Sequence, residues 1–151
     1  MKYDALLDEA NAEGISIKER PFKTYDGRIK GKDIYLRKDM NTTEKGCVLA
    51  EELGHYYTSV GNIIDMDSSS NRKQERQARL WAYNKQIGLK GLVRAYEHGC
   101  TASQEIAEYL DVTEEALQEC IEFYRDKYGE YKTVEHYIIF FIPHLAVLKK
   151  I

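Results

Sequence analysis

Apolar residues near the start of the chain recur every three or four positions. Tyr3, Leu6, Leu7 and Ala10 therefore fall on one face of a helix. Gly14 follows at a point where a helix often ends in a left-handed residue, a conformation that glycine adopts without steric cost. The pattern predicts that the chain opens with a short amphipathic helix.

The pattern changes over residues 15–38. Ile15 and Ile17 alternate with polar neighbours, and a turn signal at Tyr25-Asp26-Gly27 precedes a run of strand-forming types at residues 34–36. This alternation is typical of strands with one buried face. We predict a small antiparallel sheet of two or three strands in this part of the chain.

The rest of the chain shows mainly helical spacing, interrupted by glycines and polar runs. Helices are predicted at residues 42–59, 72–87, 92–97, 103–110 and 113–128. Thr42 or Thr43 is expected to cap the first of these helices, and the polar residues 62–71 are expected to form a surface loop. Residues 136–142 are rich in β-branched and aromatic types and stop at Pro143, which indicates a buried strand.

Composition and charge limit the kinds of partner. The chain has 151 residues, of which 22 are basic and 25 acidic, and its formal charge is −3. This balance gives no general attraction to nucleic acid or to anionic membranes. No apolar run reaches the length of a membrane span, and the three cysteines show no close pairing. We expect a cytoplasmic protein with no direct nucleic-acid or membrane partner.

The residues with chemical potential lie in the predicted helix at 42–59. Positions four apart share one helical face, so Glu51 and His55 can reach one metal ion, while Glu52 on the flank can reach a water molecule on that ion. In the usual HExxH motif two histidines hold zinc and the glutamate is the general base. Glu75 on the next helix is the expected third ligand, across an antiparallel helix pair.

Glu51 stands where the usual motif has its first histidine. This difference leaves open whether the chain is an active peptidase. Two carboxylates would neutralise a divalent ion, which would then acidify water less strongly than an ion held by neutral imidazoles. Carboxylates also favour harder ions such as manganese, although zinc accepts one histidine and two oxygens. The alternative is a solvated helix face, since the pattern EExxH also arises by chance.

Beyond this pentapeptide, a longer set of residues resembles the ImmA/IrrE metallopeptidases of phages and integrative elements. The resemblance rests on residues 47–55, residues 61–64, Glu75, Ala78 and Trp81-Ala82. It implies a zincin-like core, a cytoplasmic location, and a role in cutting or displacing the element's own helix-turn-helix repressor. The predicted ligands add a divalent metal cofactor, zinc or manganese. With the predicted elements it gives an α+β fold, mainly helical, with a small antiparallel sheet and a C-terminal helix-turn-helix-like region.

The chain is accordingly divided into two parts. Residues 1–98 are the expected zincin-like metallopeptidase core, and residues 99–151 are a helical region with a C-terminal strand, packed on that core. Residues 102–121 resemble a helix-turn-helix, but its second helix is acidic, with Glu114, Glu115, Glu119 and Glu122. Such a helix would oppose phosphate contacts, so a docking surface for protein or a plain packing unit is expected here.

Three functions follow from these observations. The leading hypothesis is a zinc-dependent endopeptidase that inactivates a repressor, with Glu51, His55 and Glu75 as ligands, Glu52 as general base, and the substrate adding to the sheet at residues 32–37. The alternative is a non-catalytic protein-binding antirepressor with a structural or vestigial metal site. A DNA-binding regulator comes last.

Overall fold

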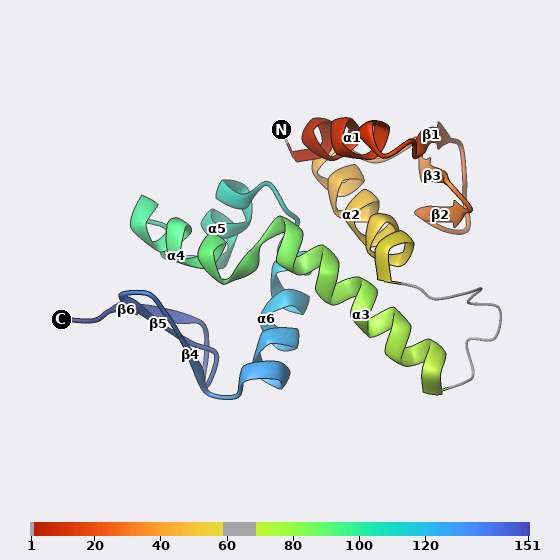
Figure 1. Ribbon diagram of the computed structural model, residues 1–151. Coiled ribbons are helices and arrows are strands. Elements are labelled where there is room, and N and C mark those ends of the chain that lie inside the picture. Colours follow the sequence, from red (N-terminus) through yellow and green to blue (C-terminus); the bar gives the residue numbers. More distant parts are fainter. Residues whose placement is uncertain (1, 59–68) are drawn as a thin grey trace. The chain divides into compact units, whose positions relative to one another are not determined.

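The structure is a computed structural model that describes residues 2–58 and 69–151. The chain forms two compact units, Met1–Lys85 and Gln86–Ile151 (Figure 1). The first contains α1 (Lys2–Ala12), β1 (Ser16–Arg20), β2 (Gly27–Lys30), β3 (Asp33–Arg37), α2 (Thr42–Thr58) and nearly all of α3 (Ser69–Gln86). The second contains α4 (Gly88–His98), α5 (Ser103–Leu110), α6 (Glu114–Tyr128), β4 (Tyr131–Val134), β5 (Tyr137–Phe140) and β6 (Ala146–Lys149). The predicted α+β class is confirmed.

The sheet of the first unit is mixed, which corrects the prediction of an antiparallel sheet. Its order is β1-β3-β2, with β1 parallel to β3 and β2 antiparallel to β3. Strands β2 and β3 are consecutive and antiparallel, but β3 and not β2 lies next to β1. The chain therefore enters β3 in the same direction as β1. Because β3 is paired on both sides, residues 32–37 offer no free edge, and strand addition at that place is wrong.

The core of the first unit lies between this sheet and α1 and α2. Alternate residues of β3, Ile34 and Leu36, are fully buried, as the period of a strand with one covered face requires. They pack with side chains that α1 and α2 contribute at helical spacing: Tyr3, Leu6, Ala10, Leu49, Ala50 and Leu53. Burying one such leucine or isoleucine contributes roughly 1.5 to 3 kcal/mol, so this cluster fixes α2 on the sheet.

The N-terminus of α2 is capped by Asn41 and not by the predicted Thr42 or Thr43. The backbone N–H of Glu44 donates to Asn41 Oδ1 at 2.8 Å, and the backbone N–H of Asn41 donates to Glu44 Oε1 at 3.1 Å. This reciprocal pair satisfies two backbone donors at the end of the helix. Thr42 is already the first helical residue, so the cap lies one position earlier.

Most other boundaries are close to their predictions. The helix at Ser103–Leu110 is confirmed, and α6 starts one residue late because Thr113 is its cap, accepting a hydrogen bond from the Ala116 N–H at 3.0 Å. The helix predicted at residues 92–97 is longer, Gly88–His98. Residues 62–68 of the predicted loop lie outside the described residues, and Ser69 already belongs to α3.

The second unit ends in an antiparallel sheet of order β4-β5-β6. The strand expected within residues 136–142 is its central strand, whereas β4 and β6 were not predicted. The core of this unit includes buried residues from its helices, from β5 and from the residue that follows β5: Leu92, Leu117, Cys120, Tyr124, Ile139 and Phe141. The unit starts at Gln86, so α4 belongs to it and not to the predicted first domain. The helix-turn-helix-like and zincin-like assignments stay predictions.

Helices α2 and α3 cross at Gly54 and Ala78. A methyl group on Gly54 would overlap the carbonyl oxygen of Ala78 and would lie 3.0 Å from its carbonyl carbon. The crossing is therefore a contact between backbones, which only glycine allows. One turn further along α3, the ring of Trp81 lies 5.2 Å from the ring of Tyr57 on α2, measured between centroids.

Gly54→Ala should destabilise the protein, although alanine is the better helix former. Alanine gains about 1 kcal/mol of helix propensity, whereas overpacking costs about 1 to 3 kcal/mol and more when backbone atoms must move. Gly46→Ala is the matched control on α2, because its added methyl would lie no closer than 3.6 Å to Tyr3. Urea unfolding, followed by the fluorescence of the single tryptophan, should show Gly46→Ala as neutral or stabilised. If the two variants were equally stable, the close backbone contact between Gly54 and Ala78 would be contradicted.

Candidate active site

The start of β2 passes directly over the face of α2 that carries Glu52. A methyl group on Gly27 would lie 2.6 Å from Val48 Cγ1 and 3.2 Å from Glu52 Cγ. Glycine at this position therefore lets the strand cover the glutamate side chain. The strand fixes where Glu52 stands and removes part of its contact with water.

This environment changes the acidity of Glu52. Burial, together with the negative charges of Glu51 and Glu75, raises the pKa of its carboxyl group to about 7. Burial disfavours the charged form, and the two like charges act in the same direction. A carboxyl group that titrates near neutral pH can take up a proton and give it back, which is the property required of a general base.

The crossing of α2 and α3 brings His55 and Glu75 together. Nε2 of His55 lies 3.2 Å from Oε2 of Glu75, an ion pair whenever the imidazole is protonated. The two side chains are 17% and 27% exposed, so the contact is mostly shielded from solvent. His55 follows Gly54 in the chain, and Glu75 lies one turn before Ala78. The predicted approach of these two residues is confirmed by their distance.

Glu51, the remaining predicted ligand, contacts an arginine. Arg79 Nε lies 3.3 Å from Glu51 Oε1 and also 3.3 Å from Glu75 Oε1. Burial disfavours the charged guanidinium, yet Glu51 and Glu75 outweigh it and raise the pKa of Arg79. One nitrogen of Arg79 is thus shared by two carboxylates that were expected to hold a metal ion.

The donor set fits a metal ion at two of its three predicted positions. Two ligands at about 2.0 to 2.1 Å from a tetrahedral zinc ion are about 3.3 Å apart, and His55 and Glu75 are 3.2 Å apart. One imidazole with carboxylates is also a known zinc donor set. Within residues 2–58 and 69–151, however, no group of three histidine, cysteine, aspartate or glutamate side chains converges as a metal centre. The complete site, with Glu51 beside His55 and Glu75, stays a prediction.

Arg79 and Gly27 are the two site residues that sequence reasoning missed. Arg79 follows Glu75 by four positions on α3, a spacing at which opposite charges meet on one helix face. That spacing was visible in the sequence. The role of Gly27 was not, because it depends on how closely β2 approaches α2.

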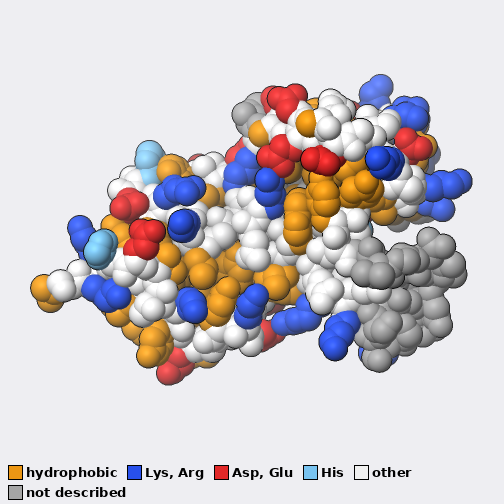
Figure 2. All heavy atoms as spheres, in the orientation of Figure 1, with side chains coloured by type: hydrophobic (Ala, Val, Ile, Leu, Met, Phe, Trp, Pro, Cys, Tyr) orange, Lys and Arg blue, Asp and Glu red, His pale blue; other side chains and the backbone are white. Residues whose placement is uncertain are grey.

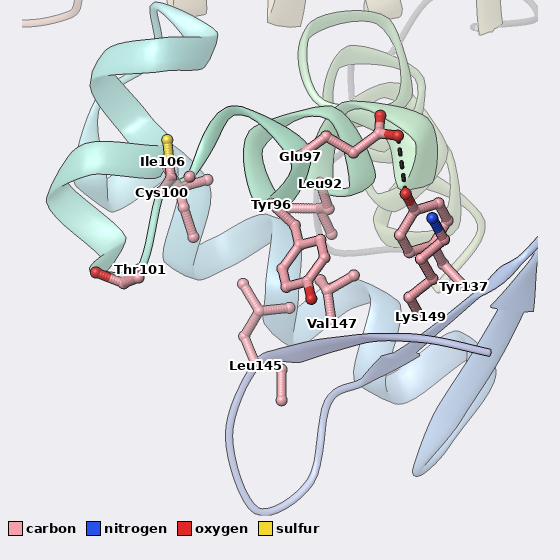
Figure 3. A pocket seen from close by; sticks show the side chains of 12 residues that line it. Leu92, Tyr96, Glu97, Cys100, Thr101, Ile106, Tyr137, Leu145, Val147 and Lys149 are labelled. Atoms are coloured by element: carbon pink, nitrogen blue, oxygen red, sulfur yellow. Dashed lines mark hydrogen bonds between the residues drawn. The ribbon is translucent and has the colours of Figure 1, made fainter. Parts of the chain in front are cut away.

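The second unit contains a hollow that holds none of the predicted site residues. It has a volume of about 730 Å³ and lies between α4, the segment after it, and strands β5 and β6 (Figure 3). Leu92, Tyr96 and Val147 form much of its apolar lining, and the Tyr137 hydroxyl donates to Glu97 Oε2 at 2.8 Å. Glu97 and Lys149 also line it, so the lining is partly apolar and partly charged.

The surface charge is mixed. On the face shown in Figure 2, basic and acidic side chains of the described residues are interspersed. The formal charge of the whole chain is −3. None of the helices in the described part of the chain is both long enough and apolar enough to cross a membrane.

Comparison with known proteins identifies the family. A model of a peptidase family, described as the IrrE N-terminal-like domain, matches residues 10–122, more than half of the chain. The chain belongs to this IrrE N-terminal-like family. Membership confirms the ImmA/IrrE resemblance and places the chain among metallopeptidase-type proteins. Neither a curated protein nor a solved structure matches the chain significantly. The matched residues include Glu51, Glu52, His55 and Glu75.

In the protein without bound metal, Glu52→Gln should increase stability at pH 8. The folded pKa of about 7 lies above the ordinary value of 4.5, so the parent loses stability as pH rises from 4.5 to 7, and glutamine removes this loss. Melting temperatures should coincide at pH 4 and separate at pH 8, with the variant higher. Glu122→Gln, at an exposed position of α6, is the control and should show no such separation. If the melting temperatures of Glu52→Gln and the parent differed by the same amount at pH 4 and pH 8, the raised pKa of Glu52 would be contradicted.

Proposed function

We propose that the chain is a zinc-dependent endopeptidase that inactivates a helix-turn-helix repressor of a phage or mobile element in the cytoplasm. The observation that carries this proposal is the 3.2 Å approach of His55 and Glu75 beside the partly buried Glu52, in a member of a peptidase family. His55, Glu75 and Glu51 would hold the ion. Manganese is the alternative metal, because two carboxylates are hard ligands.

The residues of the chain divide the work as follows. A zinc ion, when bound, supplies a Lewis acid that polarises the scissile carbonyl and lowers the pKa of water. Glu52 takes the proton from the attacking water and returns it to the leaving amine, for which a pKa of about 7 is suited. Gly27 and the start of β2 exclude bulk water from one side of that carboxyl group.

The substrate would bind as an extended segment beside β2. Strand β2 is at an edge of the sheet and Gly27, its first residue, lies against Glu52. A peptide that pairs with the free edge of β2 through main-chain hydrogen bonds would pass close to the general base. This replaces residues 32–37 as the proposed place of strand addition.

A second function is favoured by one observation. Because Glu51 is held by Arg79 at 3.3 Å, the chain would act without catalysis if no ion displaced that contact. It would then be a protein-binding antirepressor with a vestigial metal site, and the target would remain a repressor protein. DNA binding is not proposed, since the acidic helix α6 carries Glu114, Glu115 and Glu119.

Two variants should distinguish the residues needed for zinc binding from the residue needed only for cleavage. The zinc-dialysed parent should hold close to one ion per chain and cut the helix-turn-helix repressor encoded nearest to its gene. His55→Ala should lose both properties, whereas Glu52→Gln should keep the ion and lose cleavage by about a hundredfold or more. Elemental analysis and gel electrophoresis measure the two outcomes. Repressor inactivation that persists in Glu52→Gln without cleavage would establish the non-catalytic function instead.

A further inference from the structure

Arg79 stands between two carboxylates that the proposed site assigns to the metal ion. Its Nε lies 3.3 Å from Oε1 of Glu51 on α2 and 3.3 Å from Oε1 of Glu75 on α3. The other oxygen of Glu75 faces His55 at 3.2 Å. The guanidinium therefore joins the two helices through the groups that would otherwise converge on an ion.

A guanidinium and a divalent ion compete for the same oxygen lone pairs. A carboxylate oxygen that accepts a charge-assisted hydrogen bond gives one of its lone pairs to the donor and becomes a weaker ligand for a second cation. The two cations also repel each other at short range, most strongly in a partly buried site. Arg79 therefore opposes metal binding through Glu51 and Glu75 for as long as it contacts both carboxylates.

We propose that Arg79 is an internal cation that competes with the metal ion for Glu51 and Glu75 and so weakens metal binding. This inference rests on the proposed function, because it concerns the same ligands. Arg79 is a positioning residue: it holds the two carboxylates while no ion is bound, and its release lets Glu51 turn towards His55 and Glu75.

The surroundings of Arg79 allow this release. Its side chain is 39% exposed, and that of Glu51 is 36% exposed, so the guanidinium can move into water while Glu51 stays in contact with solvent. Glu75 would keep its contact with His55 during the exchange. The movement needed is a change of side-chain rotamers on the surface of α3, and the helix crossing at Gly54 and Ala78 can remain in place.

The test measures zinc affinity directly, by competition with a chelating indicator. Arg79→Ala should bind zinc about tenfold more tightly than the parent, and Arg79→Lys should lie between them because a lysine keeps the charge but loses the fork of donors. Lys73→Ala removes one charge from an exposed position of the same helix and should leave the affinity unchanged. Circular dichroism establishes that each variant is folded.

A thermal measurement gives a second readout that does not depend on activity. Without metal, Arg79→Ala should melt below the parent, because Glu51 and Glu75 lose their shared counter-charge. Added zinc should raise its melting temperature by more than it raises that of the parent. Lys73→Ala should follow the parent with and without zinc.

The outcomes distinguish this inference from the proposed function. If the parent binds zinc and Arg79→Ala binds it no more tightly, the competition is wrong while the peptidase proposal stands. If only Arg79→Ala binds zinc, the competition is supported, and the parent is not a zinc enzyme. If neither protein binds zinc, both ideas fail.

Discussion

The close crossing of α2 and α3 at Gly54 and Ala78 is the constraint on which the candidate site depends. Because Gly54 has no side chain, the backbone carbonyl of Ala78 can rest against it. Charged side chains of one helix then reach those of the other, although each helix alone displays an ordinary polar face. A wider separation would leave His55 and Glu75 as solvated groups, so a glycine with no chemistry of its own determines whether the chemistry is available.

The site combines two kinds of support. Core packing of α1, α2 and β3 fixes α2, whose residues Glu51, Glu52 and His55 fall on adjacent positions of one half-buried flank. The start of β2 then covers Glu52, and α3 supplies Glu75 and Arg79 across the crossing. The result is three acidic groups and two basic ones within a small volume. Their mutual effects appear in the raised pKa of Glu52 and in the raised pKa of Arg79.

Sequence analysis predicted the parts of this arrangement that follow from periodicity and spacing. Helices α2 and α3 were predicted because helical spacing identifies which residues share a face. The approach of His55 and Glu75 was predicted because the family resemblance includes Glu75. The parallel pairing of β1 with β3 could not be read from alternation, which is the same in both kinds of sheet. The cap at Asn41 was missed because three successive residues, all good caps, compete at that end. Arg79 was missed because its role needs two helices at once.

Glu51 and Arg79 are best understood as a matched pair. A histidine at position 51 would be a neutral ligand, and of these two carboxylates Arg79 would then keep only Glu75. Glutamate at position 51 supplies the second negative charge that holds the guanidinium in place. Restoring the usual HExxH motif by Glu51→His alone would therefore not restore the environment in which two imidazoles hold zinc, because Arg79 would remain beside the third ligand. The departure from the usual motif is the glutamate at position 51, and its chemical effect depends on Arg79 of the other helix.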